Sequence, residues 1–204
     1  MSRKDLLVLV ADKAIQRSVD SLLQRTEALG IRKVSWESYV HPERDPGCFK
    51  KSNEFLQTFL SQFDKALVLF DREGCGHDHL ARTDLEEAVE KSLASCGWVR
   101  RSAAVVIDPE LEAWVWSDSP HVDAALGWKK SELLRSWLLE EGFLTGDQHK
   151  PSRPKEAVEA VLREASKPMS SQIYAELASK VSLERCEDAS FQKFKQVLRS
   201  WFAA

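Results

Sequence analysis

Short, continuous apolar runs alternate along the chain with longer segments in which apolar residues recur at helical spacing. Residues 6–10, 66–70 and 103–107 are apolar runs of the length of buried strands, and residues 31–40 alternate like a strand. Strands that alternate with helices predict βαβ crossovers and a mostly parallel central sheet flanked by helices, which is an α/β fold. The helices expected between and after these strands cover residues 12–30, 52–63, 83–97, 109–118 and 129–142.

Local signals set the expected ends of these helices. Asp12 is a candidate N-cap for the first helix, and Gly30 is a candidate stop at its C-terminus. Thr83 and Glu86 have the spacing of a capping box. Two prolines and a glycine predict that residues 41–51 form a loop.

The pattern changes after residue 107, because no further strand is predicted. Residues 145–154 are polar and contain two prolines and a glycine, which is typical of a linker. We therefore expect an α/β domain over residues 1–150 and a helical subdomain over residues 151–204. The helices predicted there cover residues 154–166, 170–180 and 188–201.

Composition narrows the class of protein. The 204 residues include 43% hydrophobic and 30% charged residues, a balance typical of globular domains. The net charge of −3 gives no global basic field that would attract nucleic acid. The apolar run at residues 6–10 is too short for a signal peptide or a membrane span, so we expect a cytoplasmic protein without a membrane partner. The four cysteines have no CxxC spacing and are expected to be reduced.

Acidic residues follow three of the predicted strands. Asp12 stands after the first strand, and Asp71 and Glu73 stand after residues 66–70. Because ligands bind beyond the carboxyl ends of parallel strands, these side chains are expected at one edge of the sheet. Asp12 has an ordinary alternative role, since it could simply cap the following helix.

A third group of acids follows residues 103–107. Asp108 ends that strand, and Glu110 and Glu112 come shortly after it. Glu110 and Glu112 are two residues apart and cannot share one helix face, so we expect at most one of them to serve the site.

A cluster of carboxylates at one edge repels itself unless a cation is bound. Mg²⁺, or Mn²⁺ in its place, prefers such hard oxygen ligands and can assist the displacement at a phosphodiester. The predicted metal ligands are Asp71, Glu73, Asp12, Glu110 and Glu112, and the predicted catalytic residues are Asp71, Glu73 and Asp12. Gly74 and Gly76 would let a phosphate backbone approach this edge closely.

This arrangement of acids resembles the Toprim fold of topoisomerases, primases and overcoming-lysogenization-defect nucleases. "LVLFDRE" stands in the place of that family's DxD motif, with Glu73 as its second acid. In the first motif, "VADKA", Asp12 replaces the family's usual glutamate and no glycine follows. The resemblance implies that these acids hold Mg²⁺ in a nuclease that acts on nucleic-acid phosphodiesters.

The string "DPELEAWVWSD" at residues 108–118, together with "FDREGCG", is similar to small Toprim-like proteins of bacterial defence islands. This likeness implies a component of the methylation-associated antiphage defence system. Its expected partners are other proteins of that system and nucleic acid.

Other interpretations remain open at this stage. The chain could keep the Toprim-like fold without catalysis and act as an interaction or sensor subunit, as the altered first motif and the seven tryptophans suggest. A phosphohydrolase with DxD after a strand would need Asp in place of Glu73. Cys75, His77 and His79 could bind zinc, but no further Cys/His pair has a suitable spacing. Trp114 and Trp116 are two residues apart, so one is expected to be buried and the other could face outward.

Overall fold

Four parallel strands form one sheet in the computed structural model, which describes residues 3–117 and 119–204. The strand order is β2-β1-β3-β4, and each pairing between neighbouring strands is parallel. The central strands are buried on both faces, which explains why their sequences are continuous apolar runs. The predicted α/β class with a parallel sheet is confirmed. The strands are β1 (Lys4–Val10), β2 (Trp36–Val40), β3 (Phe63–Asp71) and β4 (Ser102–Ile107).

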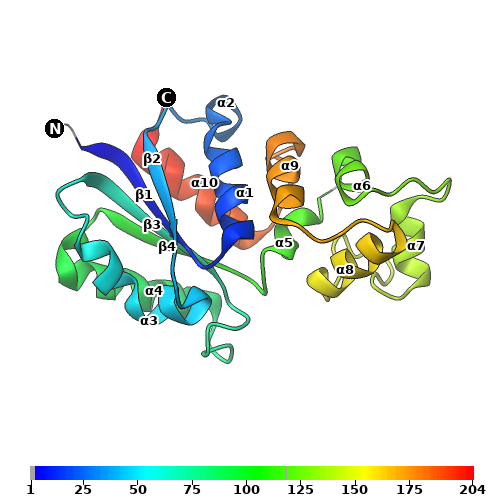
Figure 1. The fold of residues 1–204 in the computed structure, drawn as a ribbon, viewed down its shortest axis with the longest axis horizontal. Coiled ribbons are helices and arrows are strands. Elements are labelled where there is room, and N and C mark those ends of the chain that lie inside the picture. Colours follow the sequence, from blue (N-terminus) through cyan, green and yellow to red (C-terminus); the bar gives the residue numbers. More distant parts are fainter. Residues whose placement is uncertain (1–2, 118) are drawn as a thin grey trace.

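Helices cover both faces of this sheet (Figure 1). On one face, α3 (Arg44–Gln57) packs on β1 and β3, and α4 (Arg82–Leu93) packs on β4. On the other face, α1 (Lys13–Leu23) contacts β1 and β2, and α10 (Ala189–Phe202) contacts β4. The last helix of the chain is thus part of the layer over the sheet. A π-helical turn, Ala94–Trp98, extends α4.

The remaining helices lie mostly beyond the carboxyl end of the sheet (Figure 1). α9 (Ser171–Lys180) packs along α1, and α6 (Pro120–Leu126) contacts both α9 and α8 (Pro154–Glu164). The predicted domain boundary near residue 150 stays a prediction, although α9 and α10 both pack against earlier elements. Among the described residues, no helix is long and apolar enough to span a bilayer. The remaining short helices are α2 (Thr26–Leu29), α5 (Glu112–Val115) and α7 (Leu134–Glu140).

Several predicted boundaries need correction. Residues 12–30 form α1 and α2 rather than one helix, although Gly30 does end α2 in the left-handed conformation at φ 71°. The strand expected over residues 31–40 covers only its second half, Trp36–Val40. The helix expected over residues 109–118 is confined to α5, and the one over residues 129–142 to α7; residue 118 lies outside the described residues.

The predicted loop at residues 41–51 is wrong, because α3 begins inside it at Arg44. Pro46 lies in the first turn of this helix, where the missing proline N–H has no intrahelical partner to lose. Gly47 is required by packing, since a Cβ there would lie 2.1 Å from Nδ1 of His41. Proline and glycine therefore mark the start of a helix here.

The predicted capping box at Thr83 is also wrong, since the N-cap position of α4 is Ala81 and makes no side-chain hydrogen bond. Glu86 instead accepts a hydrogen bond from the backbone N–H of Val106 at 3.0 Å. In the same way Glu90 accepts one from the N–H of Ala104 at 3.0 Å. Both N–H groups lie on the free edge of β4. The two carboxylates of α4 thus provide hydrogen-bond acceptors for backbone groups that have no partner strand.

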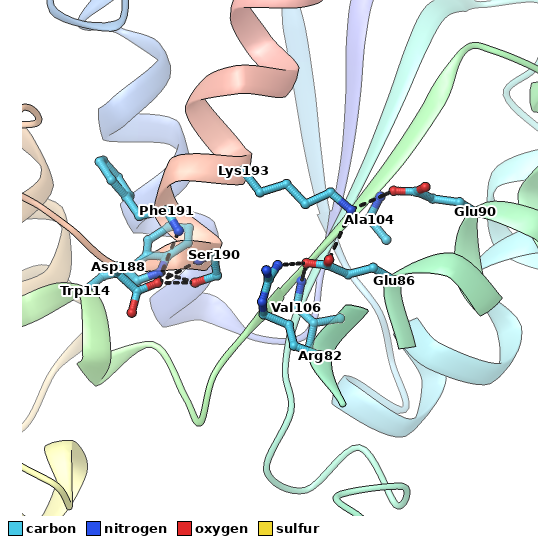
Figure 2. A network of polar contacts seen from close by, with 10 residues as sticks. All are labelled: Arg82, Glu86, Glu90, Ala104, Val106, Trp114, Asp188, Ser190, Phe191 and Lys193. Atoms are coloured by element: carbon cyan, nitrogen blue, oxygen red, sulfur yellow. Dashed lines mark hydrogen bonds and ion pairs between the residues drawn. The ribbon is translucent and has the colours of Figure 1, made fainter. Parts of the chain in front are cut away.

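A lysine from the opposite face closes this arrangement (Figure 2). Nζ of Lys193 on α10 lies 3.2 Å from Glu86 Oε2 and 2.9 Å from Glu90 Oε1. Arg82 makes a further ion pair of 2.5 Å with Glu86. We call Glu86, Glu90 and Lys193 the edge clasp, because they join α4 to α10 across β4. Covered edges of this kind prevent pairing with another chain.

The tryptophans serve packing. Trp114 and Trp116 are both buried, so the alternative in which one of them faces outward is wrong. Trp114 Nε1 donates to Ser190 Oγ at 2.7 Å, and Trp116 Nε1 donates to the carbonyl of Pro154 at 3.0 Å. The indoles thus tie α5 to α10 and α8.

The N-cap residue of α10, Asp188, lies where α10 meets α5, and its contribution to stability can be tested. Asp188 Oδ1 accepts hydrogen bonds from the N–H groups of Ser190 and Phe191 at 2.9 and 3.2 Å (Figure 2). We expect Asp188→Ala to lower the free energy of unfolding by about 1–2 kcal/mol, the cost of losing an N-cap. Urea denaturation would measure this loss, with the exposed neighbour Glu187→Ala as the control. Equal stability of the two variants would contradict the prediction.

Candidate functional site

The carboxyl ends of β1 and β3 meet as the sequence predicts. The N–H of Ala11 donates to the carbonyl of Leu69 at 3.1 Å, and Asp12 follows directly. Asp71 is the last residue of β3 and pairs in register with Ile107 of β4. The parallel register therefore brings the acids of three strand ends to one edge.

Asp71 lies at the centre of this edge. Its Oδ1 atom is buried and has no hydrogen-bond partner among the described residues. The residue as a whole keeps some exposure, so the burial concerns the carboxyl oxygen and not the whole side chain. An unpaired buried carboxyl oxygen costs free energy, which identifies Asp71 as a group that stability alone does not explain.

Asp45 joins the site and was missed by the sequence analysis. It lies in the first turn of α3, and its Oδ1 accepts a hydrogen bond from the N–H of Asp71 at 2.8 Å. The interpretation of residues 41–51 as a loop concealed it. An acidic residue directly before Pro46 is a typical start of a helix and was the signal available.

Burial is the main cause that raises the pKa of Asp71 well above its ordinary value, and four neighbouring carboxylates raise it further. Burial likewise raises the pKa of Asp45, although the hydrogen bond from the Asp71 N–H opposes this shift. Each group is thus harder to ionise than a solvated carboxyl. We call the five residues of this cluster the acidic site: Asp12, Asp45, Asp71, Glu110 and Glu112.

Glu110 and Glu112 both belong to this cluster. α5 begins at Glu112, so Glu110 precedes the helix and the argument from helix faces does not apply. Both residues are buried, and both charges raise the pKa of Asp71. Both therefore lie near Asp71, and the expectation that at most one of them serves the site stays a prediction.

Their hydrogen-bond partners distinguish the two glutamates. Glu110 accepts from the N–H and from Nζ of Lys155, each at 3.2 Å, so both of its oxygens are held by the first turn of α8. Glu112 Oε1 accepts from the hydroxyl of Tyr174 on α9 at 2.5 Å. Lys155 and Tyr174 are 45 and 62 positions away from their partners, and no local sequence pattern indicated either contact.

Asp12 has the helix-capping role that was weighed for it. Its Oδ1 accepts from the N–H of Ile15 at 2.9 Å at the start of α1. Its charge nevertheless raises the pKa of Asp71 and of Asp45. Capping and membership of the acidic site are therefore compatible.

Glu73 and Asp108 lie differently. Glu73 is exposed, and its charge raises the pKa of Glu110 rather than that of Asp71. Asp108 accepts a hydrogen bond from Nε of Arg72 at 2.7 Å. Arg72 also donates to the carbonyl of Asp78 at 2.7 Å, which links the loop after β3 to the end of β4. The structure thus places Glu73 and Asp108 at the rim.

The donor set suits a hard divalent cation. Within residues 3–117 and 119–204, no three His, Cys, Asp or Glu side chains are arranged to hold a metal ion together. Mg²⁺ commonly binds only one or two carboxylates and keeps several waters. A Mg²⁺ site therefore needs no group of three protein ligands. The unpaired Asp71 Oδ1 is the oxygen most available to such a cation. Asp12, Asp45 and Glu112 carry the neighbouring carboxylates.

The alternative zinc site has little support in the geometry. The Cys75 thiol lies 3.7 Å from Asp78 Oδ1, and the ring of His77 packs against Phe49 with 4.8 Å between centroids. The His77 and His79 rings are 6.0 Å apart. The Cys75 thiol and the His77 ring therefore have other contacts, with Asp78 and with Phe49 of α3.

Comparison of the chain with protein-family profiles, with curated proteins and with solved structures finds no match.

Proposed function

We propose that this chain is a Toprim-like component of a bacterial antiphage defence system and acts as a Mg²⁺- or Mn²⁺-dependent nuclease on nucleic-acid phosphodiesters. The defence role and the Toprim likeness rest on the motifs "LVLFDRE" and "DPELEAWVWSD". The parallel sheet is consistent with them. The reaction class rests on the acidic site.

One observation carries the proposal. Asp71 Oδ1 is buried without a hydrogen-bond partner among the described residues, and the charges of four further carboxylates act on this carboxyl group. Such an arrangement is unfavourable for the protein alone and becomes favourable when a cation balances the charge.

The residues of the acidic site would have different roles. Asp71 and Glu112 would hold the cation, and the charges of Asp12 and Asp45 would add to its attraction. When bound, a divalent cation supplies Lewis acidity to a phosphodiester and neutralises the charge that develops during its displacement. Glu110 and Lys155 fix the first turn of α8 beside this edge. The adjoining loop is unobstructed at Gly74, since a Cβ there would meet no atom within 4 Å.

The test is metal-dependent cleavage. Purified protein with Mg²⁺ or Mn²⁺ should cleave single- or double-stranded DNA or RNA, and Asp71→Asn should reduce the rate at least 100-fold, roughly the contribution of one essential electrostatic group. Asp64→Asn is the matched control, because Asp64 is an exposed aspartate near the other end of the same strand. Absence of cleavage across these substrates and metals would count against the nuclease.

A second function is favoured by the hydrogen bonds already made within the acidic site. Asp12, Asp45, Glu110 and Glu112 each accept one from the protein itself. A catalytically inactive interaction or sensor subunit would need no more than this. Purification from cells that carry the whole defence cluster tests this alternative. If no partner co-purifies and Asp71→Ala abolishes protection against phage, the alternative is wrong.

A further inference from the structure

The acidic site receives a side chain from α9, a helix that the sequence analysis assigned to a separate subdomain. The hydroxyl of Tyr174 donates to Glu112 Oε1 at 2.5 Å, and both residues are buried. A sulfur contact of 3.5 Å to Met169 is the other interaction of this hydroxyl. The contact therefore lies inside the protein, where the dielectric is low and a hydrogen bond to a carboxylate is strong.

The kind of partner matters for a cation site. Lys155 brings a positive charge to Glu110 and partly cancels the charge that would attract a cation. Tyr174 fixes Glu112 without adding any charge. The phenol donates this hydrogen bond as a neutral group, so Glu112 is held without a cationic partner.

The position of Tyr174 is set by helix packing. α9 packs along α1, and the N-cap residue of α1 is Asp12, another member of the acidic site. The same pair of helices thus brings both Asp12 and Tyr174 to the acidic site. A ligand carboxylate held by an outer hydrogen bond binds metal more tightly, because its orientation is fixed in advance.

We propose that Tyr174 is a positioning residue of the acidic site, which orients Glu112 for a divalent cation and makes α9 part of the cation-binding unit. This inference rests on the proposed cation-dependent function. It is supported by Asp71 Oδ1, which is buried without a hydrogen-bond partner among the described residues, and by the effect of the Glu112 charge on the same carboxyl group.

The chain offers a closely matched control. It contains two tyrosines, and the other, Tyr39, also donates its hydroxyl to a glutamate, Glu37, at 2.6 Å. Tyr39 lies on the edge strand β2, and its hydrogen-bond partner Glu37 is paired with Lys4. Removing either hydroxyl deletes one Tyr–Glu hydrogen bond, but only one of them touches the acidic site.

The experiment measures Mn²⁺ affinity by isothermal titration calorimetry on the full chain. We expect Tyr174→Phe to weaken Mn²⁺ binding by about 10-fold or more, the usual effect of losing an outer hydrogen bond to a metal ligand. Tyr39→Phe should bind Mn²⁺ like the wild type. Because Tyr174 acts through Glu112, the double variant Y174F/E112Q should bind no more weakly than E112Q alone.

The outcomes separate the inference from the function on which it rests. If Asp71→Asn abolishes Mn²⁺ binding but Tyr174→Phe keeps the wild-type affinity, the role of Tyr174 is refuted and the proposed function stands. A lower melting temperature of Tyr174→Phe in chelator with unchanged affinity also refutes it, since this is a purely structural effect. If Tyr174→Phe does not fold, E112Q decides, because unchanged affinity of E112Q contradicts the inference. If the wild type binds no Mn²⁺, both proposals are wrong.

Discussion

Asp71→Asn should make the protein more stable near neutral pH when divalent cations are removed. The variant deletes a buried charge whose oxygen has no hydrogen-bond partner, so we expect a gain of about 1–3 kcal/mol in the free energy of unfolding. Chemical denaturation in the presence of a chelator would measure it. Asp64→Asn should change stability by less than about 0.5 kcal/mol, because Asp64 is exposed and forms only a surface ion pair.

The same variant has a defined pH dependence. Burial and the neighbouring carboxylates raise the pKa of Asp71 in the folded protein, so the folded state binds more protons than the unfolded chain. Stability from this group is complete below the ordinary pKa of an aspartate and is lost as the pH rises through the raised pKa. The advantage of Asp71→Asn should therefore be small at about pH 4 and grow toward about pH 8.

Cation addition should reverse the order of stability. Mn²⁺ should raise the melting temperature of the wild type and leave that of Asp71→Asn nearly unchanged, because binding to the folded state alone stabilises it. A destabilised Asp71→Asn protein at neutral pH in chelator would show that Asp71 serves the fold. A residue that lowers the stability of the ligand-free protein, and whose cost is offset when the ligand binds, is typical of functional sites.

Glu86→Ala should cause one of the largest losses of stability in this protein. The substitution leaves the N–H of Val106 unpaired and removes the ion-pair partner of Lys193 and Arg82. Because Glu86 is buried, we expect a loss of about 3–5 kcal/mol in the free energy of unfolding. Urea denaturation followed by circular dichroism measures this loss.

The next residue provides the control for the edge clasp. Glu87 is exposed and forms a surface ion pair with Lys91 one turn later, so Glu87→Ala should cost less than about 0.5 kcal/mol. Glu86→Gln keeps an acceptor for Val106 and should lie between the two. If Glu86→Ala and Glu87→Ala are equally stable, the clasp does not stabilise the sheet.

Much of the framework was predictable because it depends on local patterns. Buried strands such as residues 66–70 are continuous apolar runs, and this property follows from burial on both faces of a parallel sheet. The meeting of Asp12 and Asp71 at one edge follows from parallel strand direction alone.

Other predictions were wrong because the same local sequence signal is compatible with two different structures. Proline and glycine at residues 46 and 47 predicted a loop, but they lie in the first turn of α3, and Asp45 was lost with them. Thr83 and Glu86 have the spacing of a capping box, but the Glu86 carboxylate accepts a hydrogen bond from the N–H of Val106 on β4. The first signal also fits the start of a helix, and for Glu86 a tertiary hydrogen bond replaces the local capping interaction.

The sequence by itself determined the parallel sheet and the presence of Asp12 and Asp71 at its carboxyl edge, because strand burial and strand direction are encoded in nearby residues. Only the tertiary structure decided which acids surround Asp71, that Glu73 stays at the rim, and that Glu112 is held by Tyr174. These contacts join residues up to 62 positions apart. They depend on how helices pack against one another, and no short pattern along the chain records that packing.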